Sequence, residues 1–492
     1  MAATPSPRSD SPCPAALARF LARASGARAV AIGALDRLKG GAIRHNWGVG
    51  ARFSGGALAG DQSLVLRCPG PARFCESLAP AAEFAVLKAV FAAGLTVPEP
   101  LFAGTDETVC GRPFLVMRRA AGSAAPAPIT GGDARPELAE ELGRQLARLH
   151  RIRPPRRGLA ALPAYHDSRG RIATLRAALD RRREPRPVLE WGLHWLETHL
   201  PEPAAPVLCH RDFRTGNYLL AAHGARVALT ALLDWEFAGW GDPHEDIGWF
   251  CCKAWRFARL DREAGGIADR GAFYRGYESA AERPIDRLRV HFWEVMANLR
   301  WAVIALQQSD RYIFGGETDL DLALTGRRAT ESELEILMLI DPIPDARAQR
   351  APLKGHIPEA PAGRQGVSDL TSGLRLLTRA RTVLSEDLAP LLPPDRQDEA
   401  RCVAAVLALA EREAAAGDKP FAALQADLAR FYDSPAQDDP TDLLRRFASD
   451  LGRGAFAASP GREEAARSLL WHLTIARLRI ENPQFLAANG FS

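Results

Sequence analysis

The sequence predicts an α+β protein with a small strand-rich lobe, a larger helical lobe and a further all-α domain at the C-terminal end. Three features predict these parts in this order. Short apolar runs dominate before about residue 122, helical periodicity dominates from about residue 135, and a stretch rich in proline and glycine precedes a last group of helices. The 492 residues, 47% hydrophobic and 25% charged, are enough for about three structural units of roughly 150 residues each.

Residues 25–122 are expected to form the strand-rich lobe. Five-residue apolar runs at 63–67 and 113–117 predict strands. Between them, residues 81–93 predict an amphipathic helix, because their apolar side chains are spaced by 3, 3 and 1 at Phe84, Leu87, Val90 and Phe91. Residues 1–24 are expected to be an N-terminal tail, since the first 14 are rich in proline, serine and alanine.

Residues 123–340 are expected to form the helical lobe. A core-facing stripe with spacings of 4, 4 and 3 is formed by Leu138, Leu142, Leu146 and Leu149. Further helices are expected at 189–200, 268–281 and 288–309. The region around 205–250 interrupts them, with two short apolar runs at 206–209 and 229–233 that predict buried strands.

Residues 341–368 have no hydrophobic periodicity and are expected to be a linker. Residues 369–492 are then expected to form a separate helical domain, with a stripe at Leu370, Leu374 and Leu377 marking one helix. We expect these helices to pack on one another or on the helical lobe. A homodimer contact through them is the alternative.

Composition excludes several classes of function. The 63 Lys and Arg against 59 Asp and Glu give a net charge of +4 without a basic stripe, so nucleic-acid binding is not expected. The 8 cysteines form no C-x-x-C pair and no zinc-like cluster with histidine, which indicates a reducing compartment without a structural metal. There is no run of 18 apolar residues and no signal-peptide pattern in the first 14, so we expect a cytoplasmic protein without membrane contact.

The segment most informative about chemistry is His210-Arg211-Asp212-Phe213-Arg214-Thr215-Gly216-Asn217. Asp234 follows Asn217 by 17 residues and ends an apolar run. The spacing H-x-D-x-x-x-x-N followed by a strand-ending Asp is typical of the catalytic and metal loops of kinases. The pattern could arise by chance in a long chain, but the apolar strands before both acids and the helical lobe around them favour the kinase interpretation.

The residue types in this segment suit phosphoryl transfer. A carboxylate that orients the attacking hydroxyl and accepts its proton is expected at Asp212. The amide oxygen of Asn217 and the carboxylate of Asp234 are hard oxygen ligands of the kind that Mg²⁺ prefers. Arg214 is expected to meet the transferring phosphoryl oxygens, where a cation stabilises developing charge. His210 is expected to brace the loop through hydrogen bonds.

Taken together, residues 25–335 resemble the aminoglycoside phosphotransferase family, also called the choline-kinase-like family of small-molecule kinases. Residues 39–43, with Gly40 and Gly41, resemble the hairpin that closes over the nucleotide phosphates. The strand 64–67 resembles the one that carries a phosphate-binding cation, here Arg67, and Glu83 resembles the helix acid that pairs with it. The strand 114–119, with Met117, resembles the hinge on which adenine rests, and Asp246 in 241–248 matches a position that is structural in the family.

The resemblance implies a bilobal protein-kinase-like fold and an enzyme that transfers the γ-phosphoryl group of ATP, less favourably GTP, to a hydroxyl of a small molecule with the help of Mg²⁺. More narrowly, the chain is similar to the subgroup related to kinase-like domains associated with acyl-CoA dehydrogenases, which favours a hydroxylated acyl-CoA or a related carboxylic metabolite as the acceptor. An aminoglycoside is less favoured, because no acidic cluster suited to a polycation is evident. Residues 369–486 resemble a helical domain of unknown function.

Two other classes of function share parts of this sequence pattern. The family usually has Lys where this chain has Arg67, and a guanidinium fork differs in geometry from an ammonium point charge. A nucleotide-binding pseudokinase that acts as a scaffold through residues 369–486 therefore stays open, although Asp212, Asn217 and Asp234 are all present. A protein kinase is disfavoured, because no A-P-E-like segment follows Asp234.

Overall fold

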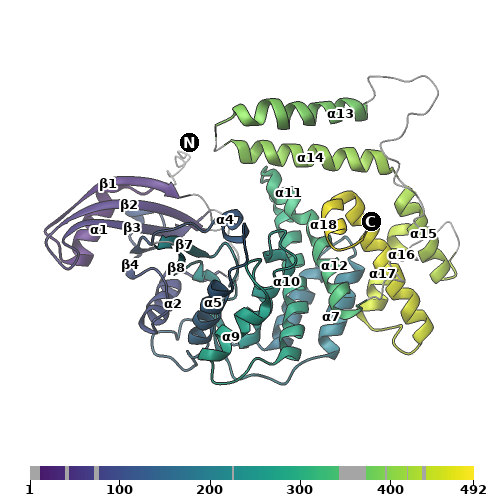
Figure 1. Cartoon of the computed structure of the whole chain (residues 1–492), viewed down its shortest axis with the longest axis horizontal. Coiled ribbons are helices and arrows are strands. Elements are labelled where there is room, and N and C mark those ends of the chain that lie inside the picture. The colour runs from purple at the N-terminus through teal and green to yellow at the C-terminus, as the bar shows by residue number, and fades with distance from the viewer. Residues whose placement is uncertain are drawn as a thin grey trace, which may run out of the picture. The chain divides into compact units, whose positions relative to one another are not determined.

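The computed structural model of the chain describes residues 11–38, 44–70, 77–223, 226–342, 373–393, 396–417, 419–434 and 439–491 (Figure 1). The expected glycines of the phosphate hairpin, Gly40 and Gly41, and nearly all of the expected linker at 341–368 lie outside these residues. The chain divides into two compact units. Unit 1 comprises residues 1–167 and 203–290, and unit 2 comprises residues 168–202 and 291–492.

An antiparallel sheet of five strands in the order β1-β2-β3-β5-β4 forms one part of unit 1. Its strands are β1 (Ala29–Leu38), β2 (Arg44–Ser54), β3 (Gly60–Pro69), β4 (Pro100–Gly104) and β5 (Phe114–Arg118). The helix α2 (Pro80–Ala92), close to the expected 81–93, follows β3 in the chain, and the short helix α3 (Glu107–Cys110) joins β4 to β5.

The register of β3 decides which of its side chains face the helical part of unit 1. Arg67 pairs with Leu115 on β5, and Val65 pairs with Met117. Leu64 and Leu66 belong to a different buried cluster from Val65, because successive side chains of a strand point to opposite faces. Arg67 therefore shares its face with Val65.

Residues 14–24 were expected to belong to an N-terminal tail, but they form most of a helix. They belong to α1 (Pro14–Ser25), which buries Leu17 and Leu21 in the cluster with Leu64 and Leu66. The spacing of 4 between these leucines gives the helix an apolar stripe, and Gly26 ends it with a φ of 70°. The proline-rich composition of the first residues obscured this local periodicity.

The helical part of unit 1 is built on two helices in close contact, α5 (Pro136–Leu149) and α9 (Arg270–Ala280), the latter close to the expected 268–281. A Cβ atom at Gly143 would collide with the carbonyl oxygen of Phe273, and one at Gly276 would collide with that of Glu140. The two backbones approach closely only because both positions are glycine.

The region expected to interrupt the helices contains two small antiparallel ribbons, which include the short strands expected at 206–209 and 229–233. β6 (Val207–Cys209) pairs with β9 (Gly239–Gly241), and β7 (Tyr218–His223) pairs with β8 (Arg226–Leu232). The remaining elements of unit 1 are α4 (Pro126–Thr130), α8 (Pro243–Cys251) and the 3-10 turns η1 (Trp235–Phe237) and η2 (Lys253–Trp255).

Unit 2 is entirely helical in its described residues. Its helices are α6 (Ser168–Asp180), α7 (Pro187–Thr198), α10 (Arg287–Ile313, from residue 291 onward), α11 (Leu320–Arg327), α12 (Ala329–Ile340), α13 (Gly373–Thr382), η4 (Val383–Leu388), η5 (Ala389–Leu391), α14 (Gln397–Ala416), α15 (Lys419–Phe431), α16 (Pro440–Gly452), α17 (Pro460–Glu481) and α18 (Pro483–Ala488). None of the helices in the described parts of the chain is long and apolar enough to cross a membrane.

One buried cluster unites the helices of unit 2 on both sides of the expected linker. It includes Leu193 of α7, Leu299 of α10, Leu337 of α12, Phe447 of α16 and Leu470 of α17. The C-terminal helices α15, α16 and α17 thus share their core with α7, α10 and α12.

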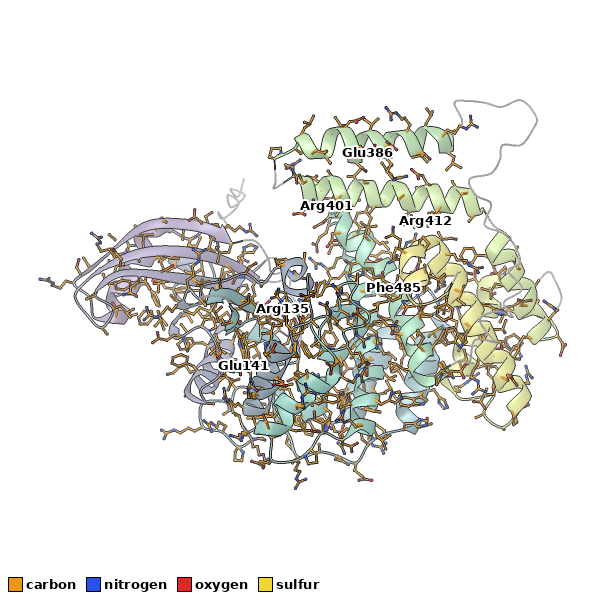
Figure 2. The ribbon with its side chains drawn as sticks, in the orientation of Figure 1. Arg135, Glu141, Glu386, Arg401, Arg412 and Phe485 are labelled. Carbon is orange, nitrogen blue, oxygen red and sulfur yellow. The ribbon has the colours of Figure 1, made fainter. Side chains whose placement is uncertain are left out.

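The helices α13 and α14 lie side by side as a hairpin (Figure 1). Arg412 of α14, labelled in Figure 2, donates to the carbonyl oxygens of Ile480 and Glu481 at the end of α17. These bonds connect the hairpin to the helices that share the core of unit 2.

Candidate active site

A cavity of about 660 Å³ lies in unit 1, and residues on the Arg67 face of the sheet form part of its lining. This volume lies within the range of roughly 300–1,000 Å³ that small-molecule sites usually have. Segments far apart in the sequence line it, among them residues from β3, α2, β5, the loop after β5, the 214–219 loop and the 232–235 turn. The lining includes Arg67, Glu83, Met117, Arg214 and Asp234, which were all singled out from the sequence.

Arg67 is buried and contacts both Glu83 of α2 and Asp234, which follows β8. Its Nε donates to Glu83 Oε1 over 2.7 Å, and its Nη1 lies 2.9 Å from Asp234 Oδ1 and 3.2 Å from Asn46 Oδ1. Burial acts to lower the pKa of Arg67, but the carboxylates of Glu83, Asp234 and Glu236 raise it above its ordinary value. The guanidinium is therefore charged throughout the physiological range.

A second buried arginine, Arg44 at the start of β2, completes the cluster. Its Nε pairs with Glu236 Oε2, and its Nη2 lies 3.5 Å from Glu83 Oε2. The same Nη2 donates to Ser77 Oγ over 2.9 Å and to the carbonyl oxygen of Leu78. Two buried cations thus alternate with buried carboxylates, which is the arrangement that makes buried charge tolerable.

Glu236 is the member of the cluster whose protonation is most sensitive to its surroundings. Burial is the largest influence and raises its pKa to about 7, with Glu83 and Asp234 acting in the same direction against the opposing charges of Arg67 and Arg44. The carboxyl group therefore changes its charge near neutral pH.

Asp212 lies in the loop after β6, where three side chains orient its carboxylate. Oδ1 accepts from Trp249 Nε1 over 3.0 Å and from Arg214 Nε over 3.1 Å, and Oδ2 accepts from Asn217 Nδ2 over 2.6 Å. Charged acceptors make stronger hydrogen bonds than neutral ones, so these three contacts fix the position of the group.

His210 and Asp246 hold the backbone of this loop. His210 Nε2 donates to the carbonyl oxygen of Leu233 over 2.8 Å, which leaves Nδ1 to accept from the N–H of Asp212 over 3.3 Å. Asp246 accepts 2.7 Å hydrogen bonds from the N–H groups of His210 and Arg211. The burial of Asp246 acts to raise its pKa, but the hydrogen bond and charge of His150 hold the pKa below the ordinary value.

One residue of this loop and one of the turn after β8 have a backbone conformation that favours glycine. Arg211 has a φ of 64° and Asp234 a φ of 60°. Left-handed non-glycine residues cost free energy and persist where the surroundings impose them, as at active sites. Here the two backbone hydrogen bonds to Asp246 fix the conformation of Arg211.

Asn217 and Asp234 fit the needs of a magnesium ion. The Nδ2 of Asn217 donates to the carbonyl and carboxylate oxygens of Asp212, and the amide oxygen is the atom that this side chain could offer to a metal ion. A hydrogen bond from the N–H of Leu233 to the carbonyl oxygen of Asn217, 2.8 Å long, holds the two ligand segments together. Amide and carboxylate oxygens beside a cavity are a donor set that suits Mg²⁺ with bound phosphates.

Among the other residues singled out from the sequence, Met117 lines the cavity from β5, and Arg214 places its guanidinium 4.6 Å from the ring centre of Trp255. Sequence reasoning missed the roles of Arg44, Glu236 and Trp249. Glu236 could have been found from its place two residues after Asp234. Arg44 and Trp249 carried no such signal, because only tertiary contacts bring them to the site.

Two family models match separate parts of the chain. Residues 34–283, just over half of the chain, match a model described as "Phosphotransferase enzyme family". Residues 390–485 match a domain of unknown function (DUF6285). The first match contains every residue of the site described above.

Known proteins resemble part of the chain. The chain is 29% identical over 197 residues to acyl-CoA dehydrogenase family member 10 of Mus musculus, covering 39% of this chain and 18% of that protein. It is 33% identical over 175 residues to acyl-CoA dehydrogenase family member 11 of Gallus gallus, covering 34% of this chain and 22% of that protein. The chain thus spans about a fifth of the length of these relatives.

A solved structure shows the fold. It is assigned to an aminoglycoside phosphotransferase of Ralstonia eutropha and superposes with a TM-score of 0.54 at 21% identity, covering 66% of this chain and 97% of that one. Together with the family match, this likeness confirms the kinase-like fold predicted from the sequence.

Proposed function

This chain belongs to the phosphotransferase enzyme family, and we propose that it transfers the γ-phosphoryl group of ATP to a hydroxyl group of a small molecule in the presence of Mg²⁺. The observation that carries the proposal is the fixed carboxylate of Asp212, held by Trp249, Arg214 and Asn217 next to the segment that bears Asp234. A base of this kind and an adjacent metal-ligand pair are what phosphoryl transfer to an alcohol requires.

The cavity supports binding of the nucleotide in one orientation. The apolar side chains of Val65, Leu87 and Met117 line the part formed by the sheet and α2 and suit a purine ring, whereas the charged group Arg67 suits the phosphates. We assign the base to the Met117 side and the phosphates to the Arg67 side, because this separates apolar from charged surface.

Asn217 and Asp234 would hold the metal ion in this arrangement. When bound, Mg²⁺ supplies positive charge that neutralises the phosphate oxygens. Arg67 lies 2.9 Å from Asp234 and compensates the negative charge of this carboxylate on that side of the cavity.

The protein's own groups handle the proton and the charge of the transferring group. The Asp212 carboxylate orients the acceptor hydroxyl and accepts its proton as the new P–O bond forms and the bond from the γ-phosphorus to the leaving ADP oxygen breaks. Arg214 lines the cavity and also contacts Asp212, so its guanidinium can stabilise the phosphoryl oxygens without moving far.

For the acceptor, we propose a hydroxylated acyl-CoA or a related carboxylic metabolite. Support comes from the names of the relatives in Mus musculus and Gallus gallus, which are acyl-CoA dehydrogenase family members 10 and 11.

A nucleotide-binding scaffold is the second candidate, and one observation favours it. Nη1 of Arg67 lies 2.9 Å from Oδ1 of Asp234 and 3.2 Å from Oδ1 of Asn46, so a metal ion bound at that carboxylate oxygen must displace the guanidinium, whereas Nη2 of Arg67 has no hydrogen-bond partner and can meet a phosphate without an exchange. A protein that binds nucleotide without turnover could keep all of these contacts.

An ATP-consumption screen separates the two candidates. The full chain would be incubated with ATP and Mg²⁺ and with pools of hydroxyacyl-CoAs, sugars, amino alcohols and aminoglycosides. Consumption with one pool, abolished in Asp212→Ala and retained in Asp61→Ala at an exposed ion pair of β3, supports the enzyme. Nucleotide binding without consumption in any pool supports the scaffold.

A further inference from the structure

A second cavity, of about 280 Å³, lies in unit 2 where the end of α6 and the start of α7 meet α16. Its lining is unusually rich in arginine. Six guanidinium groups line it, from Arg176, Arg182, Arg183, Arg186, Arg445 and Arg453. The acidic residues of the lining are Asp180, Glu184 and Glu190. The lining side chains therefore carry an excess of positive charge.

Several guanidinium nitrogens in this lining are buried without an acceptor. Arg186 is only 8% exposed, and its Nε has no hydrogen-bond partner. The same holds for Nε of Arg182 and Nη2 of Arg176. A buried donor without an acceptor costs about 1–3 kcal/mol, so three of them at one cavity need a physical explanation.

The neighbouring carboxylates engage only other nitrogens of these arginines. Arg176 pairs with Glu190 at 3.1 Å and with Glu197 at 2.9 Å, and Arg182 pairs with Asp310 at 2.7 Å. These ion pairs hold the guanidinium planes in place. The arginines are thus fixed before a ligand arrives, which reduces the entropy lost on binding.

The start of α7 adds a further feature that favours an anion. This helix of 12 residues begins at Pro187, directly after Arg186, and no side chain caps its first N–H groups. The positive end of the helix dipole therefore lies at the same segment as the most buried arginine of the cavity.

We propose that this cavity binds the phosphoryl group of a phosphorylated small molecule. A tetrahedral dianion can accept from guanidinium forks that approach from several sides, and here they come from α6, from the turn before α7 and from α16. The cavity shares no residue with the site of unit 1, so this proposal stands independently of the phosphotransferase activity.

Calorimetry of the full chain with pyrophosphate tests the proposal, with ADP and Mg²⁺ present in excess to occupy the cavity of unit 1. The double variant Arg183→Gln/Arg445→Gln removes two lining arginines. The control Arg181→Gln/Arg446→Gln removes the same charge two residues before Arg183 and one residue after Arg445, at positions that do not line the cavity. Arg183 and Arg445 are exposed, so their replacement leaves the core intact.

We expect pyrophosphate to bind the parent, and its Kd to rise roughly tenfold or more in the Arg183/Arg445 variant, because each lost charged hydrogen bond weakens binding by about that factor. In the control variant the Kd should change by about twofold at most. Equal losses in both variants, or no binding to the parent, would overturn the proposal.

A parallel titration with inorganic phosphate tells whether the cavity binds a single phosphate group or a phosphoanhydride. Affinity equal to that of pyrophosphate, with the same dependence on Arg183 and Arg445, supports a site for a single phosphate. Tighter binding of pyrophosphate with that dependence supports a ligand with a phosphoanhydride. Binding of either anion that is indifferent to both arginines contradicts the site.

Discussion

The Nη1 atom of Arg67 lies 2.9 Å from Oδ1 of Asp234. This contact joins the third strand of the sheet to the turn that follows β8, and it places a cation of the phosphate side against the carboxylate proposed to hold the metal. Both groups are charged partners of the same cluster, so a change to one alters the electrostatic environment of the other.

Replacing Arg67 by alanine is expected to weaken ATP binding and to lower the free energy of unfolding. The loss of stability should be about 3–5 kcal/mol, because Glu83 is left as a buried charge without this partner. Arg67→Lys should recover part of both losses, since an ammonium restores the charge without the bidentate fork. Denaturant unfolding and calorimetry with ATP measure the two effects.

The control for this experiment is Arg52→Ala, which breaks an exposed pair with Asp61 on the same sheet and should alter neither quantity appreciably. If Arg67→Ala binds and consumes ATP like the parent, the cation is not part of the phosphate site.

Asp234→Asn should weaken binding of ATP far more in the presence of Mg²⁺ than in its absence. The substitution removes the formal charge proposed to face the metal while keeping the size of the side chain. Calorimetry of ATP with magnesium and with a chelator provides the comparison. Equal losses under both conditions would show that Asp234 is not a metal ligand.

Trp249→Phe should lower kcat by roughly tenfold and leave the KM for ATP nearly unchanged. The ring is kept, but the hydrogen bond from Nε1 to Asp212 Oδ1 is lost, and a bond to a charged acceptor contributes about 1.5–3 kcal/mol. Steady-state kinetics with the acceptor identified by the screen would measure both constants. An unchanged kcat would mean that Arg214 and Asn217 alone suffice to orient the base.

Glu236 should make stability depend on pH between about 4.5 and 7. Its ordinary pKa is 4.5, and burial with the neighbouring acids raises the pKa in the folded protein to about 7. In that window the folded state keeps a proton that the unfolded state has released, so this contribution to stability is fully present below pH 4.5 and lost as the pH rises through 7.

The matched variant for this dependence is Glu236→Gln, which stays neutral at every pH. Between pH 4.5 and 7 the free energy of unfolding of the parent should fall relative to the variant by on the order of 3 kcal/mol. Denaturant unfolding at several pH values measures the difference. A difference that is constant across the window would mean that the carboxyl ionises in the fold as it does in the unfolded chain.

Sequence patterns predicted the parts of the site that depend on local spacing. The loop at 210–217 and Asp234 are separated by a fixed chain length, and Arg67 lies on the cavity side of β3 because it alternates with Leu64 and Leu66. The family and the kinase-like fold, inferred from these motifs, are confirmed by the family match and the solved structure.

Contacts between segments that are far apart in the sequence could not be predicted from such patterns. Arg44 meets Glu236 from a position 192 residues earlier, and Trp249 reaches Asp212 from a separate helix. Neither side chain stands out locally, since a buried arginine and a core tryptophan have the sequence surroundings of many others. The sharing of one core by α7 and α16 was likewise invisible, because hydrophobic stripes show which face is buried but not against which partner.

The kinetic constants of Asp212→Ala test the central claim most directly. With the acceptor identified by the screen, kcat should fall by roughly 10²–10⁴, the usual effect of losing a positioned base, while the Kd for ATP changes by only a few-fold. Asp61→Ala should keep the activity of the parent. A kcat of Asp212→Ala close to that of the parent would contradict the assignment of this loop as the catalytic centre.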